Sequence, residues 1–369
     1  MTRPILALSN HATFVGGGEH SFLDLVSHLP GTYPVIAAYP SEGSLAEKTC
    51  AMGIPTRIVP LPPIGPTHLV GMIDSLHTLK NICKSKQIRL IYANGSRAAF
   101  YGGTVGRLCA IPTVWHCRVS TPDPYLDPVL SRLVHRIIAN SQATASRFPS
   151  SLQGKIEVVY NGFDLEWLRD PRISKPAWIE EHWIVILMVA RTSRWKRHDL
   201  MLSAFERIAP HEPRAHLVCV GGGDPCDPLW WDELQRMTGA SSFSSRIHWV
   251  GAVEDIRPWY RTAALMVLPS DNEPFGRVIV EALASGVPVV ATRSGGIPEI
   301  VTAMESGFLI SENDADAIST AVLDIISQPA LRGQLIAEGL KRAECFGMPS
   351  HIQNMANLFQ DVMDHGRKR

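Results

Sequence analysis

The sequence predicts an α/β protein made of two doubly wound, Rossmann-like domains, each with a parallel sheet. Short apolar runs rich in β-branched residues alternate with helix-period runs along the whole chain, as in repeated β-α units. The strand-like runs are continuously apolar, which is typical of parallel strands covered on both faces. The alternation pauses near residues 165–182 and then restarts, and a length of 369 residues suits two domains.

The first half holds seven apolar runs that we predict to be strands. They are Ile5–Leu8, Val35–Ala38, Thr56–Val59, Leu90–Ala93, Thr113–His116, Ile137–Ala139 and Ile156–Val159. Helix-period segments separate them. In the first of these, Phe22, Leu25, Val26 and Leu29 recur at i, i+3, i+4 and i+7, which predicts a helix over His20–Leu29.

A polar, Pro-containing segment at residues 165–182 lacks a strand signal and is predicted to be a linker. We therefore expect a first domain over residues 1–168 and a second over residues 175–349. In open α/β sheets ligands bind beyond the carboxyl ends of the strands, so a cleft between the two domains is the expected site. The strands predicted after the linker are Ile184–Val189, His216–Val220, His248–Val250, Leu265–Leu268 and Val287–Ala291.

Charge disfavours a general nucleic-acid binder, because Lys plus Arg and Asp plus Glu both number 35. Residues 1–170 hold 15 basic and 11 acidic side chains, a net charge of +4, and the remainder holds 20 and 24, a net charge of −4. A basic first half would suit an anionic acceptor or a membrane surface. A chance imbalance between solvated faces explains the same numbers, and we favour it.

Cysteine usage and hydropathy suggest a cytoplasmic location. The seven cysteines are scattered without a Cys-x-x-Cys pair, so free thiols in a reducing compartment are expected rather than zinc ligands. The apolar run at the N-terminus is too short for a signal peptide. The longest apolar run, residues 183–190, falls far short of the ~20 residues of a membrane helix.

Four features that follow predicted strands are candidates for ligand binding. Glycines 16–18 lead into the first helix, where the backbone can approach a phosphate; a simple tight turn is an equal alternative. Arg191 and Lys196 follow the strand at 184–189 and suit a diphosphate, although a solvated basic loop would look the same. His116 ends a strand, where either a ligand contact or a structural hydrogen bond is expected. Residues 221–225 form another glycine loop, for a small-molecule contact or a tight turn.

The segment 272–300 contains two glutamates, Glu273 and Glu281, that raise the question of a catalytic pair. Glu273 lies in a predicted loop and Glu281 in the helix that follows. Eight helical steps would separate them by ~12 Å, whereas paired glycosidase carboxylates lie ~5 to ~9.5 Å apart. We therefore expect each to contact a different part of one extended ligand. The amides of Phe275, Gly276 and Arg277 are helix-start donors that can hold polar oxygens.

An Asp-x-Asp sequence at Asp314–Asp316 matches a metal-binding pattern. It also precedes a helix-period segment, where Asn313 or Asp314 would be a good N-cap. We favour the helix cap and predict no metal site and no cofactor.

Taken together, these segments resemble the retaining nucleotide-sugar glycosyltransferases of family four, which have the two-domain GT-B fold. Asn161, Gly162 and Asp164 match the family's Asn-Gly-x-Asp, and residues 273–292 (EPFGRVIVEALASGVPVVAT) resemble its most specific signature. The resemblance covers nearly the whole chain. Its other segments are residues 16–29, 137–148, 190–196 and 295–301.

The resemblance implies a role for each candidate in the second domain. Arg191 and Lys196 would bind the donor diphosphate, and Glu281 would hold the ribose hydroxyls. Glu273, with the amides of residues 275–277, would hold the transferred sugar. The family often has Gly-Arg and Lys-Gly where this chain has Ala190-Arg191 and Lys196-Arg197.

In the first domain the resemblance implies that Gly16, Gly17 and Gly18 approach the donor phosphates and that His116 faces the sugar near the reacting carbon. The final helix, near residues 350–369, would cross back to the first domain. The expected partners are a nucleotide-sugar donor and a glycan or lipid-linked acceptor, with peripheral contact at the inner membrane face left open.

The function that these features predict is metal-independent, retaining transfer of a sugar from a UDP- or GDP-sugar to an acceptor hydroxyl. Bacterial polysaccharide biosynthesis is a setting suggested by the resemblance. Two alternatives remain: a sugar-nucleotide epimerase of the same fold, and a non-catalytic nucleotide-sugar sensor. Retention of Arg191, Lys196, Glu273 and His116 together argues against a sensor.

Overall fold

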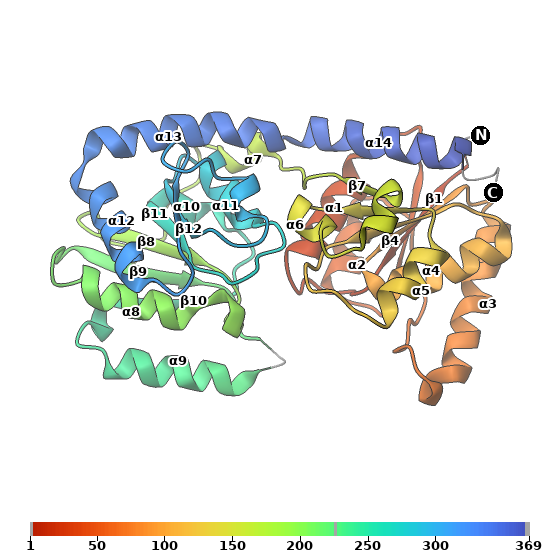
Figure 1. Cartoon of the computed structure of the whole chain (residues 1–369), viewed down its shortest axis with the longest axis horizontal. Helices are drawn as coiled ribbons and strands as arrows, with labels where there is room; N and C mark the ends of the chain where they lie inside the picture. The colour runs from red at the N-terminus through yellow and green to blue at the C-terminus, as the bar shows by residue number, and fades with distance from the viewer. Residues whose placement is uncertain (1–2, 225–226, 366–369) are drawn as a thin grey trace. The chain divides into compact units, whose positions relative to one another are not determined.

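The computed structural model describes residues 3–224 and 227–365. The chain forms two compact units, one comprising Met1–Gly162 with Met348–Arg369 and the other Phe163–Gly347 (Figure 1). The boundary therefore precedes the polar segment at residues 165–182, which was expected to be a linker. That segment belongs to the second unit, because Leu165, Leu168 and Ile179 are buried in it.

The first unit is built on a seven-stranded parallel sheet with the order β3-β2-β1-β4-β5-β6-β7. All seven predicted strands are present, with ends that differ by one residue from those expected. They are β1 (Ile5–Ser9), β2 (Val35–Tyr39), β3 (Thr56–Ile58), β4 (Leu90–Asn94), β5 (Thr113–Cys117), β6 (Arg136–Ala139) and β7 (Ile156–Val158).

Helices connect these strands, and the last helix of the chain joins the same unit. The first helix begins at Gly17, three residues before the predicted start, because Gly16 serves as its N-cap. The helices are α1 (Gly17–His28), α2 (Ser44–Ala51), α3 (Leu69–Ser85), α4 (Ser96–Cys109), α5 (Leu126–Leu133), α6 (Gln142–Ala145) and α14 (Met348–His365), with 3₁₀ turns η1 (Pro66–His68) and η2 (Ser150–Lys155).

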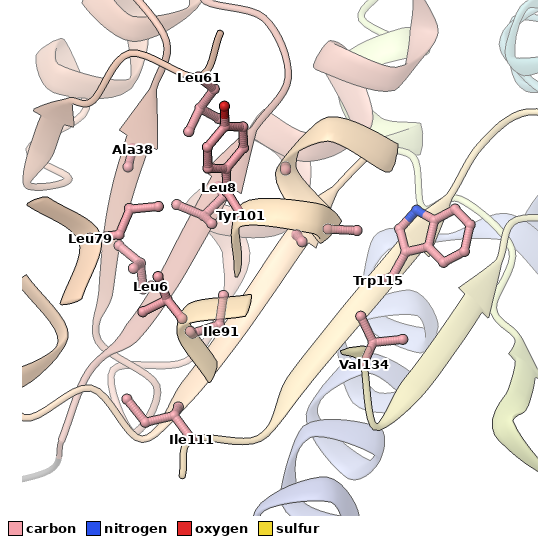
Figure 2. Packing of buried hydrophobic residues seen from close by; sticks show 14 of the residues in the cluster. Leu6, Leu8, Ala38, Leu61, Leu79, Ile91, Tyr101, Ile111, Trp115 and Val134 are labelled. Atoms are coloured by element: carbon pink, nitrogen blue, oxygen red, sulfur yellow. The ribbon is translucent and has the colours of Figure 1, made fainter. Parts of the chain in front are cut away.

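Apolar side chains cover both faces of this sheet, as continuous apolar strands require. Along β1, Leu6 and Leu8 enter one core cluster, which also holds Trp115 (Figure 2). Ile5 and Ala7 point the other way, into a cluster that includes side chains of α1 and α14. Within α14 the buried residues of this cluster are Met355, Leu358, Phe359 and Val362. Residues 366–369, the end of the predicted crossing-back helix, lie outside the described residues.

The second unit repeats the architecture with a six-stranded parallel sheet of order β10-β9-β8-β11-β12-β13. The five predicted strands are present, and the structure adds a sixth, β13, which was not predicted. The strands are β8 (Ile184–Val189), β9 (Ala215–Val220), β10 (Ile247–Gly251), β11 (Ala263–Leu268), β12 (Val289–Thr292) and β13 (Phe308–Ile310).

The helices of the second unit show why the Asp-x-Asp sequence is present. The Asp314 side chain accepts a hydrogen bond of 2.8 Å from the Ala317 amide, so the predicted N-cap is confirmed. The helices are α7 (Leu165–Leu168), α8 (His198–Ile208), α9 (Pro228–Ala240), α10 (Arg257–Thr262), α11 (Arg277–Ala284), α12 (Ala315–Ser327) and α13 (Pro329–Ala343), with 3₁₀ turns η3 (Arg194–Lys196), η4 (Ser244–Arg246), η5 (Ile297–Glu299) and η6 (Glu344–Phe346). Among the residues described, no helix combines the length and the apolarity needed to span a membrane.

Candidate active site

The strand order places a topological switch point in each sheet, which is where open α/β sheets bind ligands. In the second unit the order reverses between β8 and β11, and in the first between β1 and β4. The loop after β8 carries Arg191 and Lys196, and the loop after β11 carries Glu273. The glycines 16–18 follow β1. The predicted site residues of each unit therefore gather at the carboxyl edge of its own sheet.

The loop after β8 is held by the glycine loop after β9. The Thr192 amide donates to the Gly222 carbonyl at 3.0 Å. A Cβ added at Gly221, which has a φ of +151°, would lie 1.9 Å from the Ala190 carbonyl oxygen. Glycine at 221 is thus needed for the two loops to approach each other.

Arg191 and Lys196 differ in how they are partnered. The Arg191 guanidinium is half-buried, and no hydrogen bond or ion pair to it occurs within residues 3–224 and 227–365. The Lys196 ammonium forms an ion pair with Glu273, and it lies 3.9 Å from the centroid of the Trp195 ring. The Arg191 guanidinium is therefore available to an anion. The Lys196 ammonium could bind an anion only by leaving Glu273 or by sharing its contact with Glu273.

The Lys196–Glu273 pair bridges the switch point between β8 and β11. Its side chains are only 12% and 10% exposed. A backbone hydrogen bond of 2.7 Å from the Asp271 amide to the Trp195 carbonyl joins the same two loops. Sequence reasoning assigned Lys196 and Glu273 to different parts of a donor and missed their contact, because 77 residues separate them.

Arg197 occupies the position where the resembling family often has glycine. Its φ and ψ are +57° and +47°, in the left-handed region that costs energy for a residue with a Cβ. The guanidinium bonds to the Asp199 carboxylate, at 3.1 to 3.3 Å, and reaches the Asp271 carboxylate at 3.3 Å. These side-chain contacts link Arg197 to the loop that carries Glu273 and offset the backbone cost.

The glycines after β12 support the backbone of Glu273. The Gly296 amide donates to the Glu273 carbonyl at 2.8 Å, and the Asn272 amide donates to Ser294 Oγ at 2.6 Å. A Cβ at Gly295 would lie 2.1 Å from the Glu273 carbonyl oxygen. The Ser-Gly-Gly segment therefore positions Glu273, a role that its sequence alone did not reveal.

Glu281 lies on α11 and has its own partners. Arg277 Nε lies 3.5 Å from its carboxylate, one helical turn away, and the Tyr260 hydroxyl donates to it at 3.1 Å. Burial, together with this carboxylate, raises the pKa of Tyr260 well above its ordinary value. Glu273 and Glu281 thus pair with different cations, which supports separate roles for the two carboxylates.

The start of α11, between Glu273 and Glu281 in the chain, packs against an aromatic side chain. Phe275 is buried and its ring lies 6.4 Å from that of Phe163, nearly parallel to it. The Arg277 guanidinium lies 4.5 Å from the centroid of the Phe163 ring. Gly276 is the N-cap of α11 with a φ of +101°. These contacts therefore hold residues 275–277, which lie between Glu273 and Glu281 in the chain, in a defined conformation.

In the first unit the glycine loop forms the N-terminus of α1. The Glu19 carboxylate accepts a hydrogen bond of 2.9 Å from the Gly16 amide, which is the glutamate half of a capping box. Gly18 packs against Arg118, because a Cβ there would lie 3.3 Å from Arg118 Cδ. A phosphate approaching Gly16, Gly17 and Gly18 would meet this carboxylate at the same helix start.

His116 is fully buried in β5, with Asn94 of β4 as its register partner. Its Nδ1 lies 2.8 Å from the Tyr92 hydroxyl and 3.3 Å from Arg118 Nη2. Burial, then Arg118 and then His351, hold the pKa of His116 well below its ordinary value. The imidazole is therefore neutral at physiological pH.

Arg118 is a residue of this cluster that sequence reasoning missed. Its Nε donates to Asn94 Oδ1 at 2.6 Å and its Nη1 to Asn161 Oδ1 at 2.7 Å. Asn161 was noted only as part of the Asn-Gly-x-Asp segment. The guanidinium thus joins the ends of β4 and β5 to the segment after β7. The position of Arg118 directly after a predicted strand was the one sequence signal that could have identified it.

Two family models match the chain, one in each half. The description "Glycosyltransferase Family 4" applies to residues 15–167 and "Glycosyl transferases group 1" to residues 184–328. The first match includes His116 and the second includes Arg191, Lys196, Glu273 and Glu281.

Curated relatives carry glycosyltransferase names. The D-inositol 3-phosphate glycosyltransferase of Streptomyces avermitilis is 30% identical over 247 residues, which are 63% of this chain and 53% of the relative. The lipopolysaccharide core biosynthesis mannosyltransferase LpcC of Rhizobium leguminosarum bv. viciae is 30% identical over 194 residues, which are 51% of this chain and 54% of the relative. The matches thus span little more than half the length of these relatives.

Solved structures show the fold over almost the whole chain. Anabaena Alr3699/HepE, solved in complex with UDP and glucose, has a TM-score of 0.82 at 22% identity and covers 97% of this chain and 99% of that one. WaaG, a glycosyltransferase involved in lipopolysaccharide biosynthesis, has a TM-score of 0.73 at 14% identity and covers 97% and 99%. The predicted GT-B fold is confirmed. From the two family models, the relatives and the fold, the chain belongs to the family 4, group 1 glycosyltransferases.

Proposed function

We propose that this chain is a retaining glycosyltransferase that moves a sugar from a UDP- or GDP-sugar to a hydroxyl of a glycan or lipid-linked acceptor. The observation that carries the proposal is the Lys196–Glu273 pair at the switch point of the second unit, where Lys196 lies on the same loop after β8 as Arg191. A cation for phosphate and a carboxylate for sugar hydroxyls are thereby adjacent, as a nucleotide-sugar requires.

The chemistry follows from where charge develops. As the bond between the sugar C1 and the donor phosphate oxygen breaks, the departing nucleoside diphosphate gains negative charge. Arg191 and Lys196 would stabilise that charge, and fixed donors of this kind contribute about 10²–10³ in rate each. When the donor phosphate binds Lys196, the Glu273 carboxylate is released from its ion pair and can accept hydrogen bonds from the sugar hydroxyls.

Retention fits a front-face substitution. The acceptor oxygen bonds to C1 on the face that the phosphate leaves, and the departing phosphate oxygen takes the acceptor proton. A strong protein base is not needed on this route. His116 is not required as a base on this route, because Nδ1 of its buried neutral ring already contacts Tyr92 and Arg118.

The names of the relatives support the substrate class. HepE was solved with UDP and glucose, and LpcC is named a mannosyltransferase of lipopolysaccharide core biosynthesis. The proposal includes a hexose donor and no additional cofactor or metal. It also includes a cytoplasmic location and a role in bacterial polysaccharide assembly. Peripheral membrane contact stays a prediction, and the basic residues 366–369 that suggested it lie outside the described part of the chain.

Transfer assays with UDP-glucose and GDP-mannose as donors test this proposal. Lys196→Ala and Glu273→Ala should each lower turnover by at least about 10²-fold. Arg194→Ala is a matched control, because Arg194 lies in the same 3₁₀ turn but is 61% exposed and pairs with Asp227. Near-wild-type turnover in both site variants would contradict the proposal.

Two further measurements separate the alternatives. An epimerase would convert the donor to a new sugar nucleotide in the absence of any acceptor. A sensor would bind UDP or GDP in calorimetric titration and show no turnover with any acceptor.

A further inference from the structure

The surroundings of His116 determine which ring nitrogen carries the proton. Nδ1 faces the Tyr92 hydroxyl at 2.8 Å and Arg118 Nη2 at 3.3 Å. A guanidinium has only donors, so Nδ1 must be the acceptor of that contact. A neutral imidazole with an acceptor at Nδ1 carries its proton on Nε2.

The Tyr92 hydroxyl reinforces the same tautomer. It accepts from Arg118 Nη2 at 3.4 Å, which leaves its own proton directed to His116 Nδ1. Burial raises the pKa of Tyr92, so this hydroxyl keeps its proton. The guanidinium, the phenol and the imidazole therefore form one consistent chain of donors and acceptors.

Arg118 is itself held in a fixed orientation. Asn94 and Asn161 accept from two of its nitrogens at 2.6 and 2.7 Å. Over the described stretches of chain every hydrogen-bond partner of Arg118 is neutral, and no carboxylate contacts it. Its charge therefore acts on His116 without local compensation. The other titratable groups that face this ring are Tyr92 and His351.

The opposite nitrogen is left with a proton and no acceptor. His116 Nε2 is buried and has no hydrogen-bond partner within the described residues. An unpaired buried donor is costly, and each one in a native protein calls for an explanation. A ligand oxygen would satisfy it.

We propose that Tyr92 and Arg118 are positioning residues that fix His116 as the Nε2–H tautomer. His116 is then a neutral hydrogen-bond donor to an oxygen of the bound substrate, and it is neither the acid nor the base of the reaction. The tautomer follows from the geometry alone, and only its use in transfer rests on the proposed function.

Long-range ¹H–¹⁵N correlation spectra of histidine side chains in the full chain test the tautomer directly. The ring signals that disappear in His116→Gln should show a protonated Nε2 and an unprotonated Nδ1, unchanged from pH 8 to pH 5. A charged ring, or a proton on Nδ1, at pH 7 would overturn the proposal whether or not transfer is detected.

Variants of the positioning residues test the cause. In Arg118→Met the ring should gain a detectable Nδ1–H population, and in Tyr92→Phe/Arg118→Met a larger one, because both donors to Nδ1 are then gone. Tyr92→Phe alone should keep the Nε2–H tautomer, since Arg118 still faces Nδ1. Tyr101→Phe is the control, because Tyr101 is also buried in the first unit but donates to the Pro62 carbonyl. Melting temperatures show whether each variant is folded. Folded Arg118→Met and Tyr92→Phe/Arg118→Met variants that both keep the wild-type tautomer would contradict the assignment.

Transfer rates of His116 variants distinguish a hydrogen-bond donor from a catalytic base. The side-chain amide of glutamine can place an N–H where the Nε2–H of His116 lies, whereas that of asparagine reaches only the Nδ1 position. His116→Gln should therefore keep more kcat than His116→Asn, by about three- to tenfold, the worth of one hydrogen bond, with the pH profile of the wild type. A pH limb present in the wild type and absent in His116→Gln would identify a base and refute the donor role.

Discussion

The buried Lys196–Glu273 pair makes a quantitative prediction that needs no substrate. Breaking a buried ion pair costs about 3–5 kcal/mol, because one charge is left in a poorly solvated place. The two side chains are 12% and 10% exposed, so some solvent reaches them. We therefore expect Lys196→Ala to lower the free energy of unfolding of the second unit by about 2–3 kcal/mol. Glu273→Ala should cost less, since Lys196 can still contact the Trp195 ring.

The double variant distinguishes the pair from its separate parts. With both side chains removed no unpaired charge remains, so Lys196→Ala/Glu273→Ala should cost less than the sum of the single variants by about 2 kcal/mol. Urea unfolding of the full chain, followed by tryptophan fluorescence, measures all four corners of the cycle. The midpoints should follow the same order as the free energies.

A surface pair in the same loop supplies the comparison. Arg194 and Asp227 are joined at 2.6 Å, but their side chains are 61% and 31% exposed. The same cycle on this pair should give a coupling of at most about 1 kcal/mol, because water screens it. A coupling for Lys196–Glu273 no larger than that for Arg194–Asp227 would refute the view that the pair is buried and mutually dependent.

Two further predictions concern neighbours of Lys196. Arg197→Ala should be less stable than Arg197→Gly by about 1 kcal/mol in urea unfolding, because both lose the contacts with Asp199 and Asp271 but only alanine retains the left-handed backbone cost; equal stabilities would contradict this. Burial lowers the pKa of His198 from 6.5 to about 3, so the unfolded chain binds the proton first as pH falls. The free energy of unfolding should then decrease below pH ~6.5 by up to about 1.4 kcal/mol per pH unit, and His198→Phe should lose this part of the slope; parallel pH curves for the two proteins would exclude it.

Several parts of this protein follow from the sequence alone because their causes are local. Apolar runs located the longer strands of both sheets, since a parallel strand must be apolar on both faces. The cap at Asp314 could be predicted from its place before a helix-period segment. The separate roles expected of Glu273 and Glu281 follow from their spacing along a loop and a helix. The strand β13 was not predicted, although β3 and β7 are equally short and were.

Other features needed the tertiary structure, because sheet order decides which loops meet. Lys196 and Glu273 meet since β8 and β11 are neighbours, and alternation of strands and helices does not specify that neighbourhood. Arg118 joins Asn94 to Asn161 across the ends of separate strands for the same reason. The sequence identified which residue types were available for binding a sugar nucleotide. Their hydrogen-bond partners, burial and charge states were decided only when the parallel sheets brought distant strand ends to one edge.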